Sequence, residues 1–331
     1  MFLPRLSTCC PAVCLIASVW AMGGCQVLKP VPIPQAGYNI APELMAANEK
    51  PVEIGQPQPI IDAIGWVWGI PDKILFWDRR VSRHKISEPT LLTVAEYVEE
   101  NNLPHVKVRA NQYAPLEDLK RLPKNKTVGW PYRYTLGVLS VAGEAILPGR
   151  IVGGDHFNPF TQTVHLYSDV PAIALHELGH AKDFTRRKWQ GTYGLAYLVL
   201  PLWHETLASQ DALAYLQAHG DNAGLAEANR ILYPAYGTYV GGAIGDFVPD
   251  YAIPLYYGAV IAGHINGRML NRKLPKSASQ NAHVSAQSEW TENGSMIQLV
   301  SAINRTEFDW VSQDNALIAD TQLIEDAPLF H

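Results

Sequence analysis

Residues 171–185 read Pro-Ala-Ile-Ala-Leu-His-Glu-Leu-Gly-His-Ala-Lys-Asp-Phe-Thr, and this stretch decides how the rest of the chain is interpreted. A proline suited to a first helical turn and an apolar run up to His176 predict an α-helix from Pro171 to about Lys188. On that helix His176 and His180 lie one turn apart and face the same way. A typical surface helix does not carry such an apolar run before two histidines, so we expect a buried functional site. The alternative is a pair of core histidines hydrogen-bonded to the backbone.

The pattern His-Glu-x-x-His predicts a metal site. Two imidazole nitrogens on adjacent turns bind one Zn²⁺ at about 2.0–2.1 Å. Glu177 is too close in sequence to be the third ligand, but it can reach a water on the metal and act as general base for attack on a carbonyl. Gly179 destabilises a helix by roughly 1 kcal/mol relative to alanine. We expect its missing side chain to leave room beside the metal.

A catalytic zinc site needs a third protein ligand, and Glu205 is the best candidate. It lies early on a second predicted helix, which runs from about Pro201 to Gly220. Small residues on the same face would let this helix approach the first closely. His204 and Asp183 are weaker candidates, because His204 points roughly 100° away from Glu205 and Asp183 lies about two turns from His176. The small residues are Ala208, Ser209 and Ala212.

The His-Glu-Leu-Gly-His motif, the short strand predicted before it and the downstream glutamate resemble the zincin metallopeptidases, and within them the gluzincin branch. The resemblance covers roughly residues 90–220. It implies a zinc held by His176, His180 and Glu205, with Glu177 as the base. It also implies that residues 163–167 form the edge strand along which a peptide substrate would lie by strand addition.

One position departs from the family pattern. Many gluzincins place an aspartate four residues after the ligand glutamate to orient a zinc histidine, and here that position is Ser209. Asp183 or Asp211 is therefore a candidate for that orienting role. A donor to the transition state is expected from the region after residue 220. Its candidates are Tyr236, Tyr239 and His264.

All four cysteines lie in the first 25 residues, so the rest of the chain has neither a disulfide framework nor a cysteine-ligated metal. Residues 1–24 have the pattern of a signal peptide: Arg5 precedes an apolar stretch too short to span a membrane. The following Met22-Gly23-Gly24-Cys25 resembles the lipobox of bacterial lipoproteins, although methionine is an unusual first residue. This resemblance implies lipidation of Cys25 and attachment to the bacterial cell envelope. Gln26 favours the outer membrane over the inner one, and an ordinary signal peptide is the alternative.

Composition narrows the possible functions. Hydrophobic residues make up 47% of the chain and charged residues 17%, with a net charge of −5. The chain has no large basic block, so we expect no nucleic-acid partner. The expected partners are a peptide or protein substrate and a membrane contacted through the N-terminal lipid.

The remaining pattern predicts an α+β fold, in which a small twisted mixed sheet from residues 105–167 lies beside the metal-binding helices and a mostly helical C-terminal part. Residues 132–147 read as β-rich, with bends or bulges at Gly137 and Gly143. Residues 231–267 read as tightly packed helices, with a membrane-inserted hairpin as the alternative. We divide the chain into a signal peptide (1–24), a proline-rich tether (25–60), a catalytic domain (61–270) and a polar tail (271–331).

Three functions fit this sequence. The first is a lipid-anchored zinc peptidase of the cell envelope, and the second is a zinc amidase acting on cell-wall peptides with the same residues. The third is a non-catalytic envelope assembly protein on a zincin scaffold. The complete motif argues against the third, because a purely structural metal has no need of Glu177.

Overall fold

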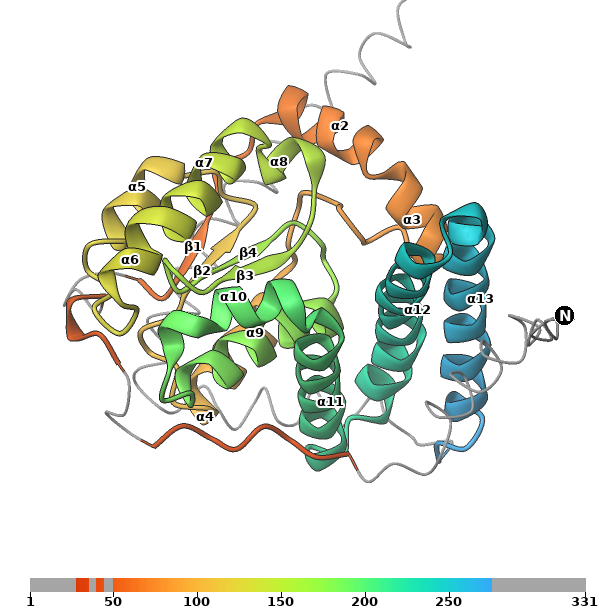
Figure 1. The fold of residues 1–331 in the computed structure, drawn as a ribbon. Helices are drawn as coiled ribbons and strands as arrows, with labels where there is room; N and C mark the ends of the chain where they lie inside the picture. The colour runs from red at the N-terminus through yellow and green to blue at the C-terminus, as the bar shows by residue number, and fades with distance from the viewer. Residues whose placement is uncertain (1–27, 36–39, 45–49, 276–331) are drawn as a thin grey trace, which may run out of the picture. The chain divides into compact units, whose positions relative to one another are not determined.

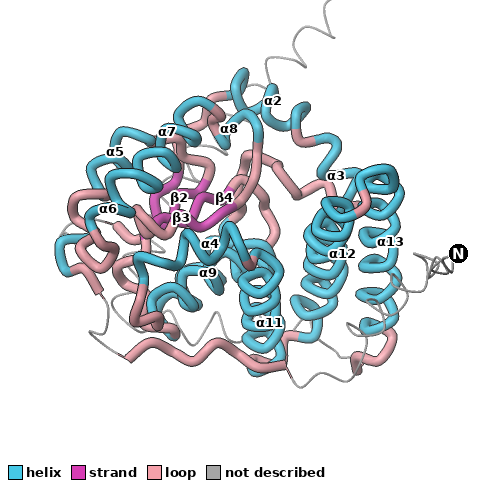
Figure 2. Tube along the Cα trace, viewed as in Figure 1, coloured by secondary structure: helices cyan, strands magenta, loops and turns pink. Residues whose placement is uncertain are grey.

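The structure, a computed structural model, describes residues 28–35, 40–44 and 50–275. These residues form a mixed α+β unit that is mostly helical, with one four-stranded sheet (Figures 1 and 2), which confirms the predicted α+β class. Cys25, the signal peptide and all but the first residues of the predicted tail lie outside the described residues. No helix among the described residues is both long enough and apolar enough to cross a membrane.

The elements follow one another with short connections. The strands are β1 (Val52–Ile54), β2 (Lys107–Ala110), β3 (His156–Asn158) and β4 (Thr163–Leu166). The helices before β4 are η1 (Pro42–Leu44), α2 (Pro59–Trp68), α3 (Ile70–Phe76), α4 (Glu88–Glu100), α5 (Pro115–Arg121), α6 (Trp130–Tyr132), η2 (Arg133–Gly137), α7 (Val138–Ile146) and α8 (Gly149–Val152). After β4 come α9 (Pro171–Thr185), η3 (Gln190–Thr192), α10 (Tyr193–Val199), α11 (Pro201–Ala218), α12 (Asn222–Phe247), η4 (Pro249–Tyr251) and α13 (Ala252–Asn271).

The strand order in the sheet is β1-β2-β4-β3, with β3 antiparallel to β4 and the other pairs parallel. The prediction that residues 163–167 form the edge strand is therefore wrong. These residues make up β4 and the turn after it, and β4 pairs with β2 on one side and β3 on the other. The edge strand next to β4 is β3.

The alternation of polar and apolar residues in β4 explains this error. Val164 and Leu166 face α9, while Thr163 and His165 face the other side of the sheet, as predicted. That polar side is covered by α5 and α7, so all four residues of β4 are buried. An alternating pattern usually indicates one solvated face, whereas here it marks a buried polar layer. In Figure 1, α5, α7 and α8 lie above the sheet and α4, α9 and α10 below it.

The prediction of β structure for residues 132–147 is also wrong, because this stretch is helical from α6 to α7. Its buried positions Gly137 and Val141 are one helical turn apart, which is the period of a helix. Gly137 serves close packing: a Cβ there would lie 3.0 Å from the side chain of Leu122 and 3.1 Å from that of Phe160. Both contact residues belong to the apolar cluster that α7 shares with α9 and η2.

Part of the predicted tether belongs to the folded unit. β1 pairs with β2, and its register places Val52 beside Val108. Val31 is buried, and its backbone N–H donates to Asp211 Oδ1 at 2.7 Å. We therefore place β1 and the residues around Val31 with the domain rather than with a tether.

The stretch predicted as tightly packed helices forms the antiparallel pair α12 and α13. Glycines allow their backbones to meet, since a Cβ at Gly237 would lie 2.6 Å from the Ala259 carbonyl oxygen and one at Gly267 only 2.0 Å from that of Asn229. The outer face of α13 is an exposed apolar stripe at intervals of four residues. It carries Ile253, Tyr257, Ile261, Ile265 and Met269.

Candidate metal centre

Helices α9 and α11 bring together three predicted ligands. The Nε2 atom of His176 lies 3.0 Å from Glu205 Oε2, and the Nε2 atom of His180 lies 3.4 Å from Glu205 Oε1. The two histidine Nε2 atoms are 3.2 Å apart. All three residues are buried. The role of this trio as metal ligands stays a prediction. The distances between its atoms can be compared with those between the ligands of a tetrahedral zinc ion.

The spacing of the two ring nitrogens and the two oxygens of Glu205 fits that comparison. Ligands at 2.0–2.1 Å from a tetrahedral zinc are about 3.4 Å apart, close to the observed 3.0–3.4 Å. The Nε2 atom of His176 faces both Glu205 Oε2 at 3.0 Å and Nε2 of His180 at 3.2 Å, but a ring nitrogen carries either one hydrogen or one lone pair and so serves only one hydrogen bond. The three residues therefore form a group with the chemistry and spacing to hold one cation.

Glycine and alanine set the separation of the two helices. A Cβ at Gly179 would lie 3.1 Å from both the Cα and the carbonyl oxygen of Ala208 on α11. Our expectation that Gly179 leaves room beside the metal is therefore corrected: the missing side chain leaves room for the second helix. This contact lets α11 approach closely enough for Glu205 to reach both histidines.

Glu205 is held in its charged form. Burial on its own raises the pKa of this carboxyl, but the charge of His180 and the hydrogen bonds from His176 and His180 outweigh it, so the pKa lies well below its usual range. The hydroxyl of Tyr197 on α10 also donates to Glu205 Oε1. Tyr197 was missed in the sequence because nothing in the apolar connection between the two helices marks one tyrosine over its neighbours.

Glu177 differs from Glu205 in its environment. It lies within one turn of both histidines and is 8% exposed. Burial raises its pKa, while His176 and His180 act in the opposite direction without reversing the shift. A carboxylate with a raised pKa is suited to accept a proton. Glu177 is not part of the three-residue donor cluster.

Ser209 takes the position that the resemblance assigns to an aspartate. Its Oγ lies 3.2 Å from Nδ1 of His176, on the side of the ring opposite Glu205. A hydrogen bond at Nδ1 keeps Nε2 available as a ligand and fixes the ring orientation. Ser209 therefore replaces the aspartate in contacting the histidine.

The two aspartates considered for that role are engaged elsewhere. Asp183 forms ion pairs with Arg186 at 2.7 Å and Arg187 at 2.9 Å. Asp211 accepts from Lys182 at 2.9 Å and from the hydroxyl of Tyr97. The structure shows neither of them in contact with His176 or His180, so the proposal that either orients a zinc histidine is corrected. His204, the weaker ligand candidate, packs its ring against aromatic residues instead.

Of the three candidate donors, Tyr239 fits best. The hydroxyl of Tyr236 is hydrogen-bonded to Thr206 at 2.9 Å. His264 stacks on Trp77, and its two ring nitrogens are occupied by Leu75 and Arg268. Tyr239 is 38% exposed and lies close to the trio, since the charges of Glu205 and Glu177 add to desolvation in raising the pKa of its hydroxyl.

Comparison of the chain with models of protein families, with curated proteins and with solved structures found no match. Any functional assignment therefore depends on the geometry of the site.

Proposed function

We propose that this chain is a zinc-dependent hydrolase of the zincin type, acting as a peptidase in the bacterial cell envelope. The observation that carries the proposal is the meeting of His176, His180 and Glu205 within 3.0–3.4 Å of one another beside Glu177. The small mixed sheet packed against the motif helix is the α+β arrangement expected for this proposal.

A bound zinc would supply a Lewis acid that polarises a carbonyl and lowers the pKa of a water to about 7. Glu177, whose pKa burial raises, would accept a proton from that water and pass it to the leaving amine. Tyr239 would donate a hydrogen bond to the oxygen on which negative charge develops. Ser209 would hold the His176 ring in its binding orientation.

The peptide would lie along β3 rather than β4, because β3 is the edge strand beside β4 and its outer edge has no partner among the described residues. β3 contacts α9, and the charge of Glu177 acts on His156 at the start of the strand. Main-chain hydrogen bonds to a free strand edge bind an extended peptide with little dependence on its sequence. Lipidation of Cys25 would place the site at the membrane surface, facing the periplasm.

The test is hydrolysis of a casein-type substrate and of cell-wall peptides by the full chain. Each is assayed as purified, after removal of metal with a chelator, and after return of Zn²⁺. A peptidase cleaves casein only when metal is present, and an amidase cleaves only the cell-wall peptides. Absence of cleavage under every condition contradicts the proposal and favours a non-catalytic role.

A further inference from the structure

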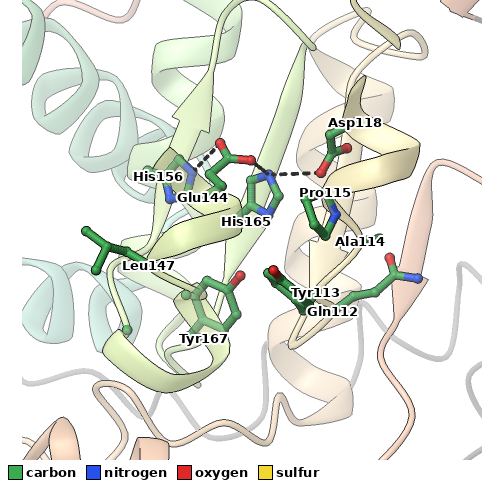
Figure 3. Close-up of a pocket in the computed structure, with 12 residues that line it drawn as sticks. Gln112, Tyr113, Ala114, Pro115, Asp118, Glu144, Leu147, His156, His165 and Tyr167 are labelled. Atoms are coloured by element: carbon green, nitrogen blue, oxygen red, sulfur yellow. Dashed lines mark hydrogen bonds and ion pairs between the residues drawn. The ribbon is translucent and has the colours of Figure 1, made fainter. Parts of the chain in front are cut away.

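A second cluster of metal-binding side chains lies in the buried polar layer between the sheet and helices α5 and α7 (Figure 3). Glu144 from α7 lies with Oε1 3.1 Å from Nε2 of His156 on β3, and with Oε2 3.7 Å from Nε2 of His165 on β4. Asp118 from α5 completes the group, with Oδ2 3.7 Å from the same nitrogen of His165. Four elements thus direct ionisable side chains toward one point.

Three atoms of this cluster have no hydrogen-bond partner among the described residues, although all are buried. They are Nε2 of His165, Oε2 of Glu144 and Oδ2 of Asp118. His165 is 3% exposed and Asp118 is 0% exposed, so water does not solvate them freely. A buried polar atom left without a partner costs about 1–3 kcal/mol. Other unpartnered atoms are scattered through the fold, but these three face one another.

The spacing of the donors fits a cation. Ligands of a tetrahedral zinc are about 3.4 Å apart, and the contacts between carboxylate oxygens and imidazole nitrogens within the cluster are 3.1–3.7 Å. Glu144, His156 and His165 each offer one ligand atom, and these atoms lie within 4.8 Å of one another. The group combines imidazole nitrogens with carboxylate oxygens, which suits a first-row divalent transition metal.

The side chains of the cluster are held in place by neighbours, as in established metal sites. Nδ1 of His156 lies 2.9 Å from the Gly154 carbonyl oxygen and donates there, so a metal ion would take the place of the Nε2 proton that faces Glu144. Asn158 donates to Glu144 Oε1 at 2.8 Å. Arg109 binds Asp118 Oδ1 at 2.9 Å and leaves Oδ2 directed at His165.

A small pocket connects the cluster with solvent. Its volume is about 50 Å³, and it is lined by Glu144, His156, His165, Asp118 and the rings of Tyr113 and Tyr167. The side chain of His156 is 38% exposed and provides the open side. The cluster is therefore not sealed from solvent.

We propose that Glu144, His156 and His165, assisted by Asp118, bind a divalent transition-metal ion such as zinc at a second site. This site is separate from the His176, His180 and Glu205 centre, and its existence does not depend on peptidase activity. The ion would join α7 and α5 to β4 and to the edge strand β3. It would thereby fix the strand that carries His156.

The experiment measures zinc per chain. The full chain is stripped of metal with a chelator, dialysed against low-micromolar Zn²⁺ and analysed by mass spectrometry for metal content. The wild type is expected to hold two equivalents, and the His156→Ala and Glu205→Ala variants one each. The double variant is expected to hold none. His219→Ala removes a histidine that is 45% exposed and paired with Glu100, so it serves as the control and keeps both equivalents.

The zinc content of the variants shows which of the two proposed metal sites is wrong. If the double variant holds as much zinc as Glu205→Ala, the second site does not exist. A wild type with one equivalent, lost only in Glu205→Ala, overturns it as well. A single equivalent lost only in His156→Ala supports the second site and contradicts the first. Circular dichroism checks that each variant is folded.

Two further measurements guard against a variant that does not fold. Glu144→Gln keeps the size of the side chain but removes its charge, and is expected to lose the same equivalent as His156→Ala. In the Glu205→Ala background, which leaves the second cluster intact, added Zn²⁺ should raise the melting temperature. No rise in that background overturns the proposal.

Discussion

The Oγ atom of Ser209 lies 3.2 Å from Nδ1 of His176, one helical turn after Glu205, which meets the other nitrogen of the same ring. α11 thus contacts both sides of one histidine of α9. A serine accepts a hydrogen bond from Nδ1 without adding the negative charge of an aspartate. The His176 ring is consequently oriented by a neutral partner.

This contact predicts that Ser209→Ala weakens zinc binding by roughly 10–100-fold, as is typical when a group that orients a ligand is removed. Ser209→Asp should bind zinc as tightly as the wild type or more tightly, because a carboxylate also accepts from Nδ1. Competition with a chromophoric chelator measures both. Thr93→Ala, which removes an exposed hydroxyl on α4, is the control. Equal affinity of Ser209→Ala and wild type would show that the contact does not orient His176.

Gly179→Ala is expected to destabilise the protein by about 1–3 kcal/mol through overpacking. The added methyl would lie 3.1 Å from the Ala208 backbone and push α11 away from α9. Zinc affinity should fall together with stability, since Glu205 moves with α11. Urea unfolding and zinc competition measure the two effects.

The matched control is Gly143→Ala on α7, where a Cβ meets nothing within 4 Å. There the gain in helix propensity of up to about 1 kcal/mol is unopposed and stability should rise. If Gly179→Ala is also stabilising, the close approach of the two helices at this point is not required.

The lowered pKa of His105 predicts that the fold loses part of its stability in acid. Burial, and next the charge of Arg121, lower its pKa to about 4, and its Nε2 lies 3.1 Å from Thr185 Oγ1. The unfolded chain, with an ordinary histidine pKa of about 6.5, binds this proton more readily. The free energy of unfolding therefore falls as the pH drops from about 6.5 toward 4.

His105→Gln keeps a polar group near Thr185 but cannot titrate. Between pH 7.5 and pH 5 it should lose about 2 kcal/mol less stability than wild type. Urea unfolding of both proteins in the presence of a chelator measures this difference, so that loss of metal does not contribute. Identical losses would contradict the assignment of the shift to His105.

Cys25→Ser tests the proposed membrane anchor. The variant lacks the only thiol that the lipobox-like segment places for lipidation, so it should be released from membranes or remain unprocessed. Fractionation of cells and the mass of the chain show which occurs. Cys14→Ser, inside the predicted signal peptide, is the control. Unchanged membrane association and processing of the Cys25→Ser protein would exclude a lipoprotein.

The sequence predicted well what depends on local periodicity. Spacing of four residues placed His176 and His180 on one face of α9, and the small residues around Ala208 predicted that α11 packs closely enough to bring Glu205 to them. The distance of 3.0 Å between Nε2 of His176 and Oε2 of Glu205 follows from these two local patterns together.

The sequence predicted poorly what depends on contacts between distant segments. The polar residues of β4 face Asp118 and Glu144 from helices far along the chain, so their alternation did not show that the strand is central. The helix around Gly137 resembled β structure because its glycines suggested bends, whereas Gly137 makes room for Phe160 and Gly143 faces open space. The cluster of Glu144, His156 and His165 has no spacing motif at all and exists only through the tertiary fold.

The central claim is tested most directly by measuring zinc content and kcat together in Glu177→Gln and Glu205→Ala. Glu177→Gln keeps the size of the side chain but removes the base, so it should retain its zinc while kcat falls by about 10²–10⁴-fold. Glu205→Ala removes a ligand and should lose one equivalent of zinc relative to wild type, together with activity. If neither substitution changes zinc content or turnover, the histidine pair is a feature of a buried helix and the proposed metal centre is wrong.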